Sequence, residues 1–202
     1  MSEQERVGEV IEACTTDFTA QCYELYKSPA LGRLVKAHWE EKADLFGVVC
    51  RATTAGIEPG RRPIARGKDE ASEEGIYRSS PQLLKLLRSE FDVAVIGFSK
   101  DETICQYLPP RPARIHGFVY LCSDEEVKAF SRSFDFLNVL LKSRLELPVE
   151  EMVGASLRQM SRVYGAEKHA FLVSAGKELA ALLSRDYVQL KAILRGLKND
   201  AI

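Results

Sequence analysis

Two glycine–lysine pairs are the nearest approach of this sequence to a phosphate-binding loop. A nucleotide-hydrolysing loop needs the pattern G-x-x-x-x-G-K-[ST], because its glycines let backbone N–H groups wrap the phosphates and its hydroxyl holds Mg²⁺. Six residues separate Gly60 from Gly67, and Asp69 stands where the hydroxyl belongs. The second pair, Gly176 and Lys177, lacks both the first glycine and the hydroxyl. We therefore expect no ATP hydrolysis by this chain on its own, and the sequence indicates no cofactor.

Histidine and carboxylate side chains form no pattern typical of a catalytic or metal centre. His38, His116 and His169 are far apart and fit no zinc-binding spacing. The nucleophile motif G-x-S-x-G is absent, and acidic pairs occur only in charge-rich segments typical of solvated loops. We therefore predict no catalytic and no metal-binding residues. A non-enzymatic role is favoured, while an enzyme or small-ligand site assembled from dispersed residues stays open.

The cysteines are interpreted as small buried hydrophobic residues in a reducing cytoplasm. They are odd in number, form no C-x-x-C pair and lie in or beside apolar runs. The chain begins with a polar segment, and no apolar run reaches the length of a membrane span. Secretion and membrane insertion are therefore not expected. The cysteines are Cys14, Cys22, Cys50, Cys105 and Cys122.

One basic cluster lies in a segment rich in glycine, proline and charge, between Gly60 and Lys68. Its cations could bind phosphates of a nucleic acid through counterion release. Carboxylates from Asp69 to Glu74 follow directly and could neutralise the cations, which would leave an ordinary solvated loop. The cluster consists of Arg61, Arg62, Arg66 and Lys68.

A second basic pair, Arg111 and Arg114, lies in an elbow that contains Pro109, Pro110 and Pro112. Proline fixes φ, so this elbow holds the chain extended and aims its side chains reproducibly. The two arginines are therefore candidates for phosphate contact. The competing interpretation is a rigid joint that leads into the last strand of a barrel.

Length and charge allow one large domain or a medium domain with an appendage. The chain has 202 residues, of which 46% are hydrophobic, so it can bury an ample core. Its 28 basic and 29 acidic side chains give a net charge of −1. No global field therefore attracts nucleic acid or a membrane, and such a contact would need a local patch.

The periodicity predicts an α+β protein: a small β-barrel over residues 1–122, followed by a helical region over residues 123–202. Short alternating segments recur about every ten residues, as in residues 17–22, where Phe18, Ala20 and Cys22 share one face. Residues 55–75 are predicted to form a long loop and residues 81–87 a short helix, while 91–98 and 114–121 are predicted to be buried strands. Inside or against the barrel we expect Phe46, Val48, Val93, Val95, Phe118 and Tyr120.

From Ser123 onward the period is helical. Ser123 and Glu126 form a capping box, and apolar residues then recur at helical spacing. The later helices carry more apolar residues than a lone helix hairpin can cover. We therefore predict that some of these residues pack on the barrel or on a second chain, with self-association or tight binding to a partner ATPase. The candidates for this partner surface are Met152, Leu157, Met160 and Phe171.

The order of short motifs over residues 6–122 resembles the HAS-barrel family. The motifs are a strand that contains Gly8, an LG-x-LV turn at 31–35, an FGVV strand at 46–49 and the PPxP elbow before the last strand. HAS barrels stand at the N-termini of HerA-type DNA translocases and of F/V-type ATP synthase subunits. The resemblance implies a closed β-barrel.

In the translocases the barrel precedes a RecA-like ATPase with a phosphate loop, which this sequence lacks. The resemblance therefore implies a stand-alone interaction or assembly module associated with a DNA-processing or ATP synthase-like ATPase machine. Its expected partners are an ATPase or nuclease, or further copies of itself. Direct nucleic-acid binding through the loop 60–68 is the alternative.

Overall fold

The computed structural model shows a closed β-barrel followed by helices, and it describes residues 5–40, 43–58, 60, 62–101, 103–144 and 146–198. The barrel strands lie in the order β2-β1-β7-β3-β4-β5, and pairing of β2 with β5 closes the ring. Every pairing is antiparallel, and β6 extends β5 as a hairpin. The predicted α+β architecture is therefore confirmed. The strands are β1 Arg6–Ala13, β2 Asp17–Cys22, β3 Leu34–Glu40, β4 Ala43–Gly56, β5 Leu87–Lys100, β6 Thr103–Cys105 and β7 Phe118–Leu121.

The barrel interior is filled by alternate residues of its strands. In β2 the predicted face of Phe18, Ala20 and Cys22 points inward and is buried. Val93 and Val95 of β5 lie in the same core. This arrangement follows from the period of two, which puts every second side chain on the same side of the sheet.

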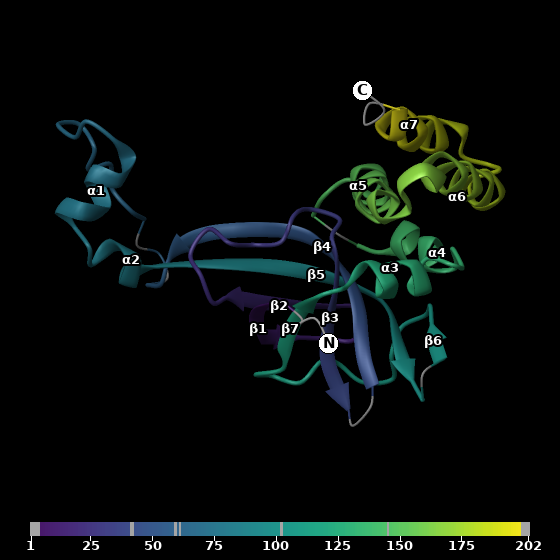
Figure 1. Cartoon of the computed structure of the whole chain (residues 1–202), viewed down its shortest axis with the longest axis horizontal. Helices are drawn as coiled ribbons and strands as arrows, with labels where there is room; N and C mark the ends of the chain where they lie inside the picture. Colours follow the sequence, from purple (N-terminus) through teal and green to yellow (C-terminus); the bar gives the residue numbers. More distant parts are fainter. Residues whose placement is uncertain are drawn as a thin grey trace.

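A second core lies between the outer face of the barrel and the helices. Phe46 and Val48 of β4 point into it, so they lie against the barrel rather than inside it. Figure 1 shows α3, α4, α5, α6 and α7 gathered beside one end of the barrel. The helices are α3 Asp124–Phe130, α4 Phe136–Lys142, α5 Val149–Ser161, the 3₁₀ helix η1 Arg162–Glu167, α6 Lys168–Leu182 and α7 Tyr187–Lys198.

The predicted partner surface is corrected by this packing. Met152, Leu157 and Met160 of α5 are at most 1% exposed, and Phe171 of α6 is 6% exposed. All four belong to the core that the helices share with the barrel. Helical spacing predicts that these side chains are buried. It does not indicate whether they pack against this chain or against a second one.

The start of α3 agrees with the sequence. Ser123 Oγ accepts a hydrogen bond from Glu126 N at 3.3 Å, and Glu126 Oε2 accepts one from Ser123 N at 2.9 Å. The predicted capping box is therefore present. It fixes the point at which the chain leaves β7 and enters the helical region.

Two local predictions were only partly right. The segment 55–75, expected to be loop, ends inside helix α1, Glu73–Ser79, which Ser72 caps by accepting a hydrogen bond from Gly75 N. The expected helix at 81–87 is only α2, Leu83–Leu86. Helix α1 buries no residue, so it has no apolar periodicity that the sequence could reveal. Its cap and its two leading carboxylates favour it instead.

The last barrel strand is shorter than expected, and its first side chain, that of Phe118, points away from the barrel interior. A turn at 115–116, with His116 at φ 66°, precedes β7. Phe118 is 39% exposed, and the Arg6 guanidinium lies 4.2 Å from the centre of its ring. Tyr120 is half-buried, while Val119 between them fills the barrel interior.

Strands β4 and β5 are 14 residues each and run on past the barrel as a two-stranded arm. Helices α1 and α2 stand at the tip of this arm, far from the helical region (Figure 1). The molecule therefore has the shape of a U, with the arm and the helices as its two limbs. We call the described residues between 57 and 86 the arm tip.

Candidate interaction surface

The described part of the chain brings together no group of three or more His, Cys, Asp or Glu side chains that could hold a metal ion. His38 lies 3.4 Å from Asp44, and His116 contacts Glu9 on the barrel surface. His169 is exposed on α6. None of the helices in the described ranges is long and apolar enough to cross a membrane.

The cysteines are all unpaired, and three of the five are buried as predicted. Burial raises the pKa of Cys22 and Cys50 to about 11, and it raises the pKa of Cys122 further. These thiols stay protonated at neutral pH, which makes them poor nucleophiles. Cys14 is exposed and Cys105 is half-buried, so the prediction was wrong for these two.

Lys36 is a buried cation that joins the barrel to the helices. It lies on β3 with 7% exposure, and its Nζ is 2.5 Å from Glu126 Oε1 on α3 and 3.5 Å from Asp44 Oδ2 on β4. Burial by itself lowers the pKa of Lys36, but the hydrogen bond to Glu126 and the charges of Asp44 and Glu126 outweigh it and raise the pKa. The geometry is that of a structural ion pair, because both carboxylates are already engaged.

We predict that this ion pair makes stability fall at alkaline pH. A lysine whose pKa is raised on folding stabilises the fold below its unfolded pKa of about 10.4, and that contribution is lost as the pH rises through the folded pKa. Urea unfolding of the wild type and of Lys36→Met should be compared between neutral and strongly alkaline pH. The wild type is expected to lose more stability than the variant over that window. Equal losses would contradict the assignment.

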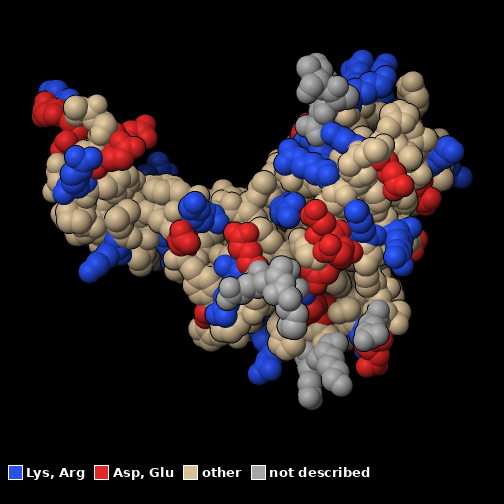
Figure 2. Space-filling view, in the orientation of Figure 1, with Lys and Arg blue, Asp and Glu red and all other residues tan. Residues whose placement is uncertain are grey.

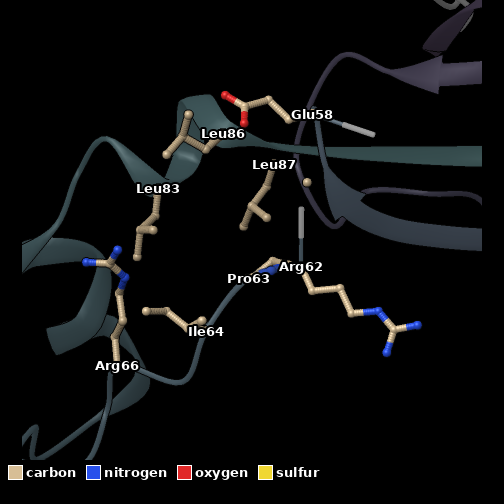
Figure 3. A pocket seen from close by; sticks show the side chains of 9 residues that line it. Glu58, Arg62, Pro63, Ile64, Arg66, Leu83, Leu86 and Leu87 are labelled. Carbon is tan, nitrogen blue, oxygen red and sulfur yellow. The ribbon is translucent and has the colours of Figure 1, made fainter. Parts of the chain in front are cut away.

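The arm tip contains an apolar cavity of about 150 Å³. Figure 3 shows Ile64 of the basic loop across from Leu83 of α2 and Leu87 at the start of β5, and Leu86 of α2 also lines the cavity. The loop residues 62–66 pass along α2 without secondary structure of their own. Side chains around the cavity stay exposed: Ile64 is 73% exposed and Leu86 46%. Large apolar side chains left open to water at the end of a protruding arm indicate a contact surface.

Part of the predicted basic cluster borders this cavity. Arg62 and Arg66 line it, and Lys68 is exposed in the turn that follows. Among the residues that the structure describes, neither Arg62 nor Arg66 forms an ion pair. Arg61 lies outside the described residues. Arg62 and Arg66 therefore border an apolar cavity, and the cluster does not form a continuous basic surface.

The base of the arm is fastened to the barrel by the loop after β2. Tyr26 N donates to Ser89 Oγ at 2.9 Å, and Ser89 Oγ lies 2.7 Å from Thr54 Oγ1 across the two arm strands. The hydroxyls of Tyr26 and Tyr77 are 2.5 Å apart, which ties the same loop to α1. These contacts hold the arm tip in a defined place relative to the barrel.

The proline elbow is packed as a joint. Trp39 Nε1 donates to the carbonyl oxygen of Pro112 at 3.1 Å, and the ring of Tyr107 packs edge-on against Phe98 with centroids 5.2 Å apart. Arg111 and Arg114 have exposed side chains on this joint, away from the arm tip in the chain. The structure therefore does not assemble the two predicted basic groups around one cavity.

A polar groove of about 840 Å³ lies between the barrel wall and the linker from α4 to α5. Several of its polar side chains form hydrogen bonds or ion pairs with one another. Thr19 Oγ1 donates to Asp92 Oδ1 at 2.7 Å, and Arg51 Nη1 is 3.0 Å from Glu146 Oε2. Acidic and basic groups are mixed here, so the groove favours no single class of ligand.

Helix α7 carries a basic stripe that the sequence analysis did not single out. Lys191, Arg195 and Lys198 follow one another at intervals of four and three residues and are all exposed. Such spacing puts them on one face of the helix. Ile193 and Leu197 of the opposite face are buried in the core. This stripe could have been identified from the sequence, because α7 contains three cations and no acidic residue to balance them.

No model of a known protein family matches this chain, and no curated protein matches it. The function must therefore be argued from the barrel, the arm and the charges of the chain itself.

Proposed function

We propose that this chain is a non-enzymatic interaction and assembly module that works beside an ATPase machine of the HerA or ATP synthase type. The observation that carries the proposal is the arm tip. It stands clear of the barrel, is fixed at its base and has an apolar cavity open to solvent. An arm of this kind reaches a second molecule, since its own barrel and helices are already packed without it.

The arrangement at the tip favours a protein over a nucleic acid as the bound molecule. Apolar side chains with exposures of 44–73% lie among the arginines, whereas a phosphate backbone is bound by rows of cations and polar groups. Acidic residues also follow the basic ones directly, which weakens attraction to phosphates. Protein interfaces have this composition, with an apolar centre and arginine among the enriched residues.

The resemblance to the HAS-barrel family is the reason for proposing an ATPase or nuclease as the partner. A closed six-strand barrel is what a HAS-like domain requires. Gly32 of the LG-x-LV turn has a left-handed φ of 77° and touches the backbone of α5, so in this chain the motif serves to hold the helical region. The helices thus occupy one side of the barrel and leave the arm on the opposite side (Figure 1).

The proposal is tested by capture from native lysate with the full chain as bait. An ATPase or nuclease is expected among the captured proteins. The double variant Ile64→Asp, Leu86→Asp should capture at least about tenfold less of it, because each charge would be buried in the contact. Val173→Asp is the matched control, since Val173 is 43% exposed on α6, away from the arm.

If the wild type, the arm variant and the control capture equal amounts, the arm tip does not form the contact with the partner. Absence of any ATPase or nuclease would overturn the function itself. Binding of labelled DNA or RNA by the wild type, lost in Arg62→Glu, Arg66→Glu, would instead establish the nucleic-acid alternative.

A further inference from the structure

The two limbs of the molecule carry short clusters of opposite charge. Asp69, Glu73 and Glu74 are exposed just before and within the first turn of α1, at the arm tip. Lys191, Arg195 and Lys198 are exposed on α7, at the end of the helical limb. Figure 2 shows red side chains gathered at the tip of the arm, with blue ones next to them, and blue side chains at the top of the opposite limb, with red ones below. None of these six residues forms an ion pair within the described ranges.

The two limbs also carry complementary apolar features. Tyr187 and Val188, which begin α7, are 69% and 80% exposed, and Val188 continues the stripe of the three cations at a spacing of three residues. The cavity of about 150 Å³ at the arm tip is of the size that accepts a benzene-sized ring in an apolar protein cavity. An exposed apolar pair beside the basic stripe thus stands on one limb, and an apolar cavity stands on the other, where Arg62 and Arg66 line the cavity and the acidic residues lie in and before α1.

We infer that a second copy of this chain is what the arm tip binds: the arm of one copy takes Tyr187 and Val188 of the next, and its acidic residues face the basic stripe on α7. This inference rests on the proposed assembly function and names one partner for it. Contact between two different surfaces of the same chain is head-to-tail, so each copy can bind two neighbours. Such contacts build a ring if the rotation closes and a filament if it does not.

The lengths of the two charged surfaces are compatible. The cations from Lys191 to Lys198 span roughly 10 Å of α7, given the rise of about 1.5 Å per residue. The acidic residues from Asp69 to Glu74 occupy a similarly short segment, which includes one turn of α1. Pairing within one copy is excluded by the shape, since the two surfaces stand on opposite limbs.

The test uses two charge reversals in the full chain. The arm variant is Glu73→Lys, Glu74→Lys, and the helix variant is Lys191→Glu, Arg195→Glu. In sedimentation at low salt, the mass of the wild type should rise with protein concentration. Each reversal should weaken association by at least about tenfold, because it puts like charges opposite one another. Higher salt should weaken the wild type in the same direction.

Mixing the two variants is the decisive measurement. The basic arm of the first then meets the acidic helix of the second, and the acidic arm of the second meets the basic helix of the first. Association is therefore expected to return in the equimolar mixture, although each variant alone is monomeric. This recovery is the result expected for a contact between the arm and α7. Circular dichroism of each variant confirms that it is folded.

The matched control is Lys128→Glu, Arg132→Glu, which reverses two exposed cations four residues apart elsewhere in the helical region. It should associate like the wild type. A monomeric wild type, a control that loses association as the helix variant does, or a mixture that stays monomeric would each overturn the inference. A monomeric chain that still captures an ATPase or nuclease through its arm would overturn this inference alone and leave the proposed function standing.

Discussion

Replacement of Phe130 by alanine is expected to lower the free energy of unfolding by about 3–5 kcal/mol, the range for truncation of a buried aromatic side chain. Phe130 ends α3 with 1% exposure. Its ring centre lies 5.1 Å from that of Phe46 on β4 and 5.6 Å from that of Phe136 on α4. The ring therefore joins the outer face of the barrel to the helices, and its loss leaves a cavity between them. Urea unfolding followed by circular dichroism measures the change.

Phe118→Ala is the matched control. The ring of Phe118 is 39% exposed, so its removal leaves no closed cavity, and we expect a loss of less than about 1.5 kcal/mol. Phe118 was predicted to lie inside or against the barrel, and the structure places its ring on the surface. Equal losses for the two variants would mean that the barrel and the helices do not share a core.

This shared core changes how association should be tested. Deletion of residues 148–202 would remove Met152 and Leu157 together with the rest of α5, so it would not separate assembly from folding. Met152 and Leu157 share a core with Phe46 and Val48, so the deletion would expose the outer face of the barrel. The newly exposed apolar surface could itself cause aggregation. Substitutions on the exposed limbs of the full chain avoid this effect.

The elements with regular periods could be predicted from the sequence. In β2 the alternation of Phe18, Ala20 and Cys22 determined which side faces inward, because a one-residue slip would turn the whole set outward. The capping box at Ser123 determined the switch from barrel to helices, because both of its hydrogen bonds are local. Prediction succeeded for these elements because short-range patterns alone specify them.

The candidate surface depends on contacts that no local pattern encodes. The cavity at the arm tip forms only when Ile64 meets Leu83 and Leu86, across the turn and helix between them. The arginines of the cluster 60–68 could be identified from the sequence, but their apolar neighbours could not. The stripe on α7 was detectable from its spacing, yet its meaning comes from the position of α7 on the limb opposite the arm.

Substitution of Gly32 by alanine is expected to cost about 2–5 kcal/mol of stability, from two separate causes. The φ of 77° costs a residue with a Cβ about 1–2 kcal/mol. A Cβ at this position would also overlap the carbonyl carbon of Ala155 and lie 2.6 Å from Ser156 N, which are backbone atoms of α5. Because backbone cannot rotate aside as a side chain can, α5 must shift off the barrel, and overpacking of this kind adds about 1–3 kcal/mol.

Gly60→Ala separates the two causes. Gly60 has a φ of 80°, close to that of Gly32, but no atom lies within 4 Å of the position that a Cβ would take. Its substitution should therefore cost only the conformational part, at most about 2 kcal/mol. Thermal and urea unfolding of both variants measure the difference, and the excess for Gly32→Ala reports the contact of the β2–β3 loop with α5. If the two substitutions cost the same, the helical region is not held against the barrel at this glycine, and the LG-x-LV turn does not fasten α5 to the barrel.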